Sequence, residues 1–281
     1  MSRFQIFAFA DEASADMTGQ IDAMCRNGLN GLEVRHVDKE NVSTISLEKA
    51  REVRRMLDDH GLVAWSIGSP AGKIRMDADF QSHLDIYRHT LEVAQILGAK
   101  NLRVFSFYMG EDDPSVHRQA VMDRMGQFLE LAEDSGIVLC HENEKGIYGM
   151  TAERCADLHR TFPKLRAIFD PANFVQCGED TLRAWELIAP YVEYLHIKDS
   201  LADGRVVPAG KGAGNIPQIV RHYVAQGGRA MTLEPHLTVF DGLKELEEEG
   251  NTSAVGGFSY PSADAAFDTA CDALREILKE V

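Results

Sequence analysis

The sequence has few of the features that mark secreted, membrane-spanning or nucleic-acid-binding proteins. Its five cysteines are scattered and never spaced as CxxC, so they offer neither a disulfide framework nor a zinc ribbon, and they are typical of reduced intracellular thiols. No apolar run reaches the roughly 18 residues that a membrane-spanning helix needs. The opening stretch MSRFQIFAFAD is too short and too polar at its ends for a signal peptide. We therefore expect a cytoplasmic protein with no membrane partner.

Basic residues are scarce relative to acidic ones. The 281-residue chain has 29 Lys and Arg against 44 Asp and Glu, which gives a formal net charge of −15. Partners that are bound through cationic side chains, such as duplex DNA or an anionic membrane surface, are therefore disfavoured. We expect no nucleic-acid partner. The hydrophobic fraction of 44% and the charged fraction of 26% are those of a globular protein.

One alternation is repeated eight times along the chain. Short apolar runs open at residues 4, 31, 62, 101, 137, 165, 192 and 229, and each interval has room for a helix and two loops. Gly61, Gly98 and Gly136 lie where three of these helices should end. The pattern predicts an α/β protein, a single (β/α)8 TIM barrel over residues 1–281. A doubly wound open sheet would want a glycine-rich turn after the first strand, and FAFADEASADM has none.

One stretch does not follow the alternation. Residues 237–261 come after the eighth predicted strand and include an acidic run at positions 245–249. We expect an extended loop here, on the C-terminal face where barrel active sites are built. A lid over that face and a solvated acidic insertion both agree with its composition.

Side-chain alternation along strands five to eight predicts polar groups inside the barrel. The outward residues of these strands must be apolar because they face the helices, which leaves the intervening residues inward. The inward residues near the C-terminal strand ends are Glu142, Asp170, His196 and Glu234. Three carboxylates and an imidazole in a low-dielectric mouth need a cation between them, and Mn²⁺, Mg²⁺ or Zn²⁺ suits such ligands. Taken singly, each glutamate could instead form a structural ion pair, and His196 could be a hydrogen-bonded core residue.

A family resemblance rests on the same residues. The segments HENEKG, FDPANF, LHIKD and TLEPH, in this order and spacing, resemble the xylose isomerase-like barrel superfamily, most specifically over residues 137–236. The resemblance implies a divalent-metal-dependent isomerase or epimerase of a small-molecule sugar or sugar phosphate, assembled as a homodimer or homotetramer. The single metal ion, with Mn²⁺ expected first and Mg²⁺ or Zn²⁺ as alternatives, would be held by Glu142, Asp170, His196 and Glu234. Asn173 stands where many relatives have a histidine that contacts substrate.

The resemblance also implies a mechanism. Adjacent carbonyl and hydroxyl oxygens of the sugar would be held by the metal, with Glu142 and Glu234 on opposite faces of the neighbouring carbon. One carboxylate would remove a proton and the other would return it, through a metal-stabilised enediolate.

Further polar residues are candidates for substrate binding. Lys198 is inward on strand seven and could contact substrate oxygens or form a salt bridge with an inward acid. Arg205, in the glycine-rich segment GRVVPAGKGAGN, corresponds by resemblance to an arginine that touches substrate hydroxyls; a solvated charge on a turn is the alternative. Glu33 and Arg35 also face the interior from strand two; for one of them, an internal Glu33–Arg103 ion pair and substrate binding are both open.

Two rival functions use the same residues. A metal-dependent dehydratase of a keto-inositol or keto-sugar acid would form the same enediolate but expel a β-hydroxyl. A non-catalytic, metal-stabilised carbohydrate-binding barrel would need the ion but no proton transfer. The superfamily also includes a DNA-repair endonuclease, which the net charge of −15 disfavours.

Overall fold

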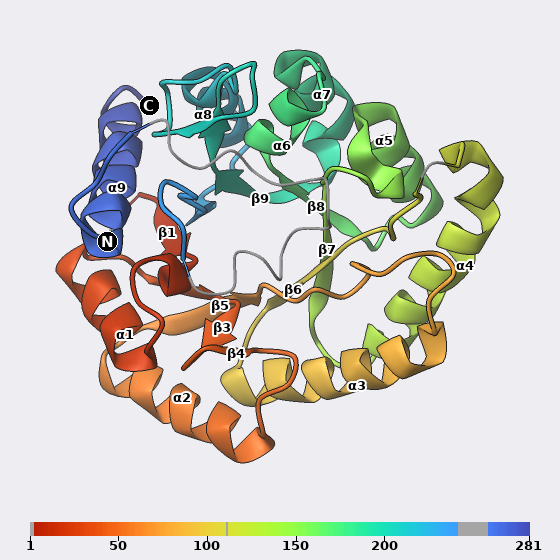
Figure 1. Ribbon diagram of the computed structural model, residues 1–281, viewed down its shortest axis with the longest axis horizontal. Helices are drawn as coiled ribbons and strands as arrows, with labels where there is room; N and C mark the ends of the chain where they lie inside the picture. Colours follow the sequence, from red (N-terminus) through yellow and green to blue (C-terminus); the bar gives the residue numbers. More distant parts are fainter. Residues whose placement is uncertain (1–2, 111, 241–257) are drawn as a thin grey trace.

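Eight parallel strands form a closed barrel in the computed structural model, which describes residues 3–110, 112–240 and 258–281. Their order around the barrel is β1-β12-β9-β8-β7-β6-β5-β2, with the helices outside (Figure 1). The strands are β1 (Gln5–Ala8), β2 (Gly31–Val34), β5 (Val63–Ile67), β6 (Asn101–Val104), β7 (Val138–Glu142), β8 (Arg166–Phe169), β9 (Val192–Ile197) and β12 (Ala230–Leu233). Each begins within one residue of its predicted opening, so the predicted (β/α)8 barrel is confirmed.

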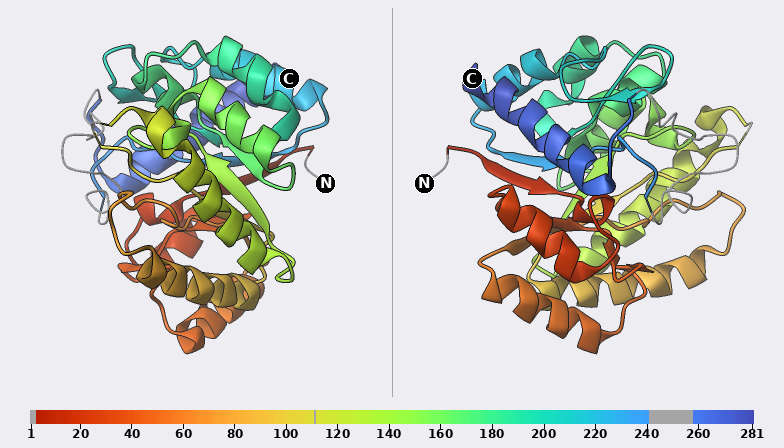
Figure 2. Two further views of the ribbon diagram at one scale, coloured as in Figure 1. Left: turned by 90° about the vertical axis from the view of Figure 1, so that its right-hand side faces the viewer. Right: turned by 60° about the vertical axis from the view of Figure 1, so that its left-hand side comes forward.

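Helices follow the strands and form the outer layer. They are α1 (Met17–Arg26), α2 (Leu47–Asp59), α3 (Phe80–Leu97), α4 (Pro114–Ala132), α5 (Ala152–Thr161), α6 (Pro171–Gln176), α7 (Thr181–Ile188), α8 (Ile216–Ala225) and α9 (Ala263–Lys279). Gly61, Gly98 and Gly136 adopt the positive φ angles of 68°, 71° and 75° that favour glycine after a helix. The last helix lies beside α1 and completes the ring (Figure 2). Within the described residues no helix has the length and apolarity needed to cross a membrane.

The core has two parts, and they confirm the predicted strand parity. Outward residues such as Leu139, Phe169 and Leu195 belong to the large layer between strands and helices. A smaller inner cluster is formed by Phe7, Cys140, Ile168, Tyr194 and Ala230, with Trp65 packed against it. These side chains fill the barrel interior, so the polar residues of the same strands lie above them, toward the C-terminal ends.

Short elements extend the barrel at this C-terminal end. The hairpin β3 (His36–Val37) and β4 (Glu40–Asn41) follows β2, and the hairpin β10 (Asp199–Ser200) and β11 (Val206–Val207) follows β9. The Asp199 carboxylate accepts hydrogen bonds of 2.9 Å from the backbone N–H groups of Gly210, Gly212 and Gly214. A Cβ atom at Gly212 would lie 2.3 Å from Asp199 Oδ1, so this loop requires glycine there. Of the extended loop predicted for residues 237–261, residues 241–257 lie outside the described part of the chain.

Candidate metal centre

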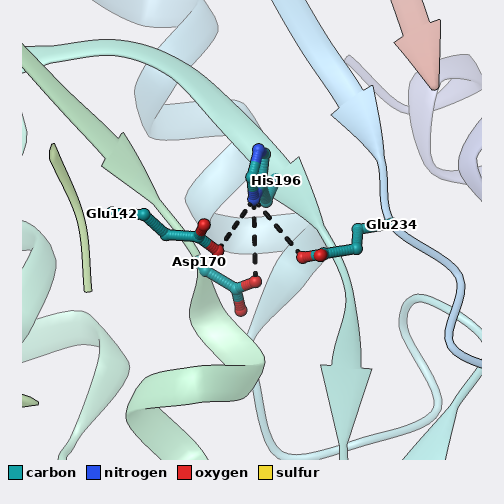
Figure 3. Close-up of side chains that lie close together, drawn as sticks. All are labelled: Glu142, Asp170, His196 and Glu234. Atoms are coloured by element: carbon teal, nitrogen blue, oxygen red, sulfur yellow. Dashed lines mark hydrogen bonds and ion pairs between the residues drawn. The ribbon is translucent and has the colours of Figure 1, made fainter. Parts of the chain in front are cut away.

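Four side chains from four neighbouring strands meet at the C-terminal end of the barrel. Glu142 ends β7 and His196 lies in β9, whereas Asp170 directly follows β8 and Glu234 directly follows β12. All four residues are at most 3% exposed. One potential ligand atom from each lies within 4.8 Å of the others, and Figure 3 shows the three carboxylates turned toward the imidazole. The structure therefore brings together all four residues predicted to bind the metal.

The two ring nitrogens of His196 face different groups. Nδ1 lies 3.0 Å from Glu142 Oε1, 3.4 Å from Glu234 Oε2 and 3.9 Å from Asp170 Oδ2. On the other side of the ring, Nε2 lies 3.1 Å from Glu33 Oε2. A carboxylate behind a histidine ligand accepts the N–H of one nitrogen and leaves the other free to bind a metal. Glu33 is in the position to do this, so Nδ1 is the nitrogen that faces the candidate metal position.

In the part of the chain that it describes, the structure does not show the ion pair with Arg103 that the sequence suggested for Glu33, and a role of Glu33 in substrate binding stays a prediction. Its carboxylate also accepts a 2.9 Å hydrogen bond from the Tyr194 hydroxyl. No ion pair between Glu33 and Arg103 forms within the described residues at salt-bridge distance; Arg103 instead lies 3.0 Å from Glu142 Oε2. The interaction of Glu33 with His196 was not anticipated, because it joins strands that are far apart in the sequence.

The turn after β8 fixes the orientation of Asp170. Its Oδ1 accepts a 2.9 Å hydrogen bond from the backbone N–H of Asn173 and so caps α6, which has Pro171 in its first turn. The Asn143 side-chain amide accepts from Asp170 N at 3.0 Å and donates to Asp170 O at 2.9 Å. Oδ2 has no hydrogen-bond partner among the described residues and faces Lys198 Nζ as an ion pair at 2.9 Å. One carboxylate oxygen is thus used by the fold, and the other is available to an ion.

Buried cations surround the acids of the cluster. Lys198 Nζ lies 2.8 Å from Glu234 Oε2, in addition to its pair with Asp170. Arg35 Nη1 lies 3.3 Å from Glu234 Oε1. The salt bridges considered for Lys198 from the sequence are therefore present, and its contact with substrate stays a prediction.

Burial and neighbouring charges shift the pKa values of the cluster. Burial raises the pKa of Asp170 to about 7, against the opposing effect of Lys198. Burial alone would raise the pKa of Glu234, but Lys198, His236 and His196 together hold it well below its ordinary value. Burial alone would lower the pKa of His196, but Glu142 and Glu33 raise it well above its ordinary value. The carboxylates thus hold a proton on the imidazole tightly, and a bound metal would take the place of that proton.

The donor set fits a divalent ion. An ion about 2.0–2.2 Å from each ligand requires ligand atoms roughly 3–4 Å apart, close to the observed separations of at most 4.8 Å. Three carboxylates and one imidazole form an oxygen-rich set suited to Mn²⁺, Mg²⁺ or Zn²⁺. Residues Glu142, Asp170, His196 and Glu234 could therefore hold such an ion with small side-chain movements.

The predicted substrate-binding residues lie at different places. Asn173 is buried beside the cluster, where its Nδ2 donates to Asn143 O at 2.9 Å and lies 3.4 Å from Glu142 Oε1. Arg205 lies between β10 and β11, paired with Asp203 at 2.8 Å, and its side chain is 51% exposed. The structure therefore places Asn173 at the candidate metal centre and does not bring Arg205 there. The roles of both in substrate binding stay predictions.

Two buried carboxylates of the mouth, those of Asp11 and Glu12, were not predicted from the sequence, whereas the predicted inward position of Arg35 is confirmed. Asp11 and Glu12 lie in a short 3-10 helix after β1, and Arg35 directly follows β2. Arg35 donates to the two oxygens of Asp11 at 2.8 and 3.0 Å and to Glu12 Oε1 at 3.1 Å. Asp11 and Glu12 could have been found from the sequence, because they follow the first strand as Asp170 follows the sixth.

A family model supports this fold from the sequence side. The model described as xylose isomerase-like TIM barrel matches residues 21–249. The chain belongs to this family. Among curated proteins, it is 23% identical over 240 residues to the uncharacterized protein YihM of Escherichia coli (strain K12). That match covers 80% of this chain and 66% of YihM, so the chain spans slightly less than two thirds of this relative's length.

Solved structures of other proteins resemble nearly the whole chain. The probable 3-DHS dehydratase AsbF from Bacillus anthracis matches with a TM-score of 0.74 and 16% identity, over 97% of this chain and 98% of AsbF. The 3-keto-D-glucoside 4-epimerase YcjR from E. coli matches with a TM-score of 0.71 and 13% identity, over 98% and 99% of the two chains. The IOLI protein, whose structure contains a zinc atom, matches with a TM-score of 0.74 and 14% identity, over 98% of each chain. At identities this low, the likeness shows the fold.

Proposed function

We propose that the protein is a divalent-metal-dependent isomerase or epimerase of a small-molecule sugar. The observation that carries the proposal is the buried set of three carboxylates and one imidazole at the C-terminal end of the barrel, where active sites of this fold lie. The likeness to YcjR, a 3-keto-D-glucoside 4-epimerase, supports this class of reaction, and the likeness to the zinc-containing IOLI protein supports a bound metal.

One ion, Mn²⁺ first and Mg²⁺ or Zn²⁺ as alternatives, would be held by Glu142, Asp170, His196 and Glu234. When bound, it supplies a Lewis acid that polarises the substrate carbonyl and makes the neighbouring C–H bond more acidic. Glu142 and Glu234 lie on opposite sides of the cluster (Figure 3). One carboxylate removes the proton from the carbon next to the carbonyl, and the other delivers a proton to the enediolate. Arg103 and Lys198, paired with these two carboxylates, hold their orientation while the proton moves.

The charges of the mouth favour an uncharged sugar over its phosphate. Besides Asp199, which binds the glycine-rich loop, six buried carboxyl groups of the described residues lie at the mouth with three buried Lys and Arg side chains, so a divalent ion would leave no surplus positive charge for a phosphate. The carboxyl groups are those of Asp11, Glu12, Glu33, Glu142, Asp170 and Glu234, and the cations are those of Arg35, Arg103 and Lys198. Each of these cations already pairs with a carboxylate. A phosphate would therefore compete with buried ion pairs.

Proton exchange with solvent tests the proposal. The Mn²⁺-loaded protein is incubated in heavy water with ketohexoses, keto-inositols and their phosphates, and deuterium incorporation is followed by NMR. We expect deuterium at a carbon next to the carbonyl, and loss of this exchange in Glu142→Gln and Glu234→Gln. Turnover of a substrate without deuterium incorporation would contradict proton abstraction with solvent exchange. Binding without any turnover would instead support the carbohydrate-binding barrel.

A dehydratase is the second candidate. The likeness to AsbF, a probable 3-DHS dehydratase, over 97% of this chain favours it. The first step would be the same, but the proton taken by the carboxylate would then pass to the β-hydroxyl, which would leave the enediolate as water instead of the carbon being reprotonated. The same incubations would then produce the ultraviolet absorbance of an enone, whereas an epimerase or isomerase produces none.

A further inference from the structure

His236 is a buried imidazole of the mouth that the proposed mechanism does not use. It follows Glu234 by two residues, and it is 5% exposed. Neither Nδ1 nor Nε2 has a hydrogen-bond partner among the described residues. Buried side-chain nitrogens are normally hydrogen-bonded, because leaving them unpaired costs the free energy of their lost hydration.

The position of the ring is fixed by other contacts. The ring stacks on Phe240, with centroids 5.5 Å apart and an interplanar angle of 24°. The backbone N–H of His236 donates to Glu12 Oε2 at 2.6 Å. The backbone is held at a φ of +45°, in the left-handed region that residues other than glycine rarely adopt. The fold thus holds, in a strained conformation, an imidazole that has no hydrogen-bond partner among the described residues, a combination found at functional sites.

The surroundings of the ring place it beside the candidate metal centre. Nε2 lies 3.5 Å from Glu12 Oε1 and 3.6 Å from Glu234 Oε1, without hydrogen-bond geometry to either. Lys198, Arg35 and Asp11 are close enough to act electrostatically on the ring. Charges of both signs therefore surround it, and its two ring nitrogens can form hydrogen bonds with a ligand.

We propose that His236 is a substrate-binding residue whose ring hydrogen-bonds a hydroxyl group of the sugar next to the metal-bound part of the substrate. The inference rests on the proposed function and adds a determinant of which hydroxyl the enzyme recognises. A neutral imidazole has one donor and one acceptor nitrogen, and a hydroxyl group can satisfy either. A site that hydrogen-bonds a hydroxyl discriminates strongly against an analogue that lacks it, because the protein group is then left unpaired.

Two substitutions separate the hydrogen bond from the shape of the site. His236→Phe keeps a ring to stack on Phe240 but removes both nitrogens. His236→Asn keeps donor and acceptor atoms and tolerates a left-handed φ. Binding of D-fructose, D-psicose, D-tagatose and myo-inosose to the Mn²⁺-loaded protein is measured by calorimetry, and Mn²⁺ affinity is measured separately for each variant without sugar.

We expect His236→Phe to weaken binding of the preferred ketose by roughly 10- to 100-fold, as for loss of a buried hydrogen bond. His236→Asn should stay nearer to the wild type, and neither variant should change Mn²⁺ affinity. Monodeoxy analogues of that ketose identify the hydroxyl: its removal should weaken binding to the wild type but have no further effect in His236→Phe. If His236→Phe does not fold, His236→Gly removes the ring and suits the positive φ.

The results that would contradict these expectations distinguish a failure of the role of His236 from a failure of the proposed function. Wild-type affinity in the variant that lacks the ring nitrogens would refute the role of His236 while leaving the proposed function standing. A parallel loss of Mn²⁺ affinity would show that His236 supports the metal ligands instead of the sugar, and would also refute it. If the wild-type protein neither binds nor exchanges any ketose, the proposed function fails, and the inference fails with it.

Discussion

The two halves of the barrel mouth balance their buried carboxylates in different ways. The arginine half, at the ends of β1, β2 and β6, contains Asp11, Glu12 and Glu33 with Arg35 and Arg103, of which Arg103 pairs across the mouth with Glu142. The metal half, at the ends of β7, β8, β9 and β12, contains Glu142, Asp170 and Glu234 with His196 and Lys198.

The difference lies in how completely the acids are paired. In the arginine half, both oxygens of Asp11 accept hydrogen bonds from Arg35, at 2.8 and 3.0 Å. In the metal half, Asp170 Oδ2 has an ion pair with Lys198 but no hydrogen-bond partner among the described residues. A guanidinium is a permanent cation with a fixed hydrogen-bonding geometry. A carboxylate oxygen without a hydrogen-bond partner could instead bind a metal ion, and that ion could bind the substrate as well. We infer that the arginine half supports the site and that the proposed proton transfer belongs to the metal half.

The largest expected effect is a loss of protein stability when the arginine half is changed. Arg35→Met would leave Asp11 and Glu12 buried without their cation. Removing one partner of a buried pair costs about 3–5 kcal/mol, so we expect the free energy of unfolding to fall by this amount, measured by urea denaturation at pH 7.

Lys198→Met is the matched control in the metal half. The loss of unfolding free energy caused by Lys198→Met should be smaller with Mn²⁺ bound than without it, because the ion would then neutralise Asp170 and Glu234 in place of the lysine. Equal losses in both conditions would contradict the proposed division between the halves.

The fold could be predicted from the sequence because its signals are local. Each apolar run marks a strand, and Gly61, Gly98 and Gly136 mark helix ends through their own backbone angles. Strand parity follows from neighbouring residues alone, since Leu195 on the helix side places His196 inside. The parts of the site that depended on parity were therefore predicted.

The other contacts of the mouth depend on which distant segments meet. Arg35 reaches Glu234, 199 residues away, and Glu33 reaches His196, 163 residues away. No local pattern specifies such pairs. Arg205 illustrates the opposite case, because it pairs with its sequence neighbour Asp203 between β10 and β11. The family resemblance, which implied a contact of Arg205 with substrate, gave no sign of this local ion pair.

The next largest effect tests the metal half directly. Glu234→Ala and His196→Ala each remove one ligand of the proposed ion. Changes to supporting groups around a ligand typically cost 10- to 100-fold in affinity, so loss of a ligand should exceed about 100-fold. Equilibrium dialysis with Mn²⁺ measures this, with Arg205→Ala as a control outside the cluster. Undiminished Mn²⁺ content in both ligand variants would refute the proposed metal site.

Glu33→Gln tests whether the arginine half supports the metal half. The substitution weakens the acceptor behind His196 Nε2 while keeping the shape of the side chain. We expect Mn²⁺ affinity to fall by about 10- to 100-fold, with less effect than loss of a ligand. An unchanged affinity would mean that His196 keeps its orientation without Glu33, and that the two halves act independently.

The smallest effect concerns the helices around the barrel, where buried histidines on the two sides should have the same effect on the pH dependence of stability. His83, on α3, and His159, on α5, are each shifted by burial to a pKa of about 4 from an ordinary value of 6.5. Between these pH values the unfolded imidazole is protonated and the folded one is not, so acidification lowers stability by up to about 1.4 kcal/mol per pH unit for each group. His83→Gln and His159→Gln should each remove one of the groups that takes up a proton on unfolding. The change of the unfolding free energy with pH, measured by urea denaturation from pH 7 to pH 4, should therefore become smaller by up to about 1.4 kcal/mol per pH unit in each variant. If the pH dependence of stability changed in only one of the two variants, the helices outside the two halves of the mouth would also differ from each other.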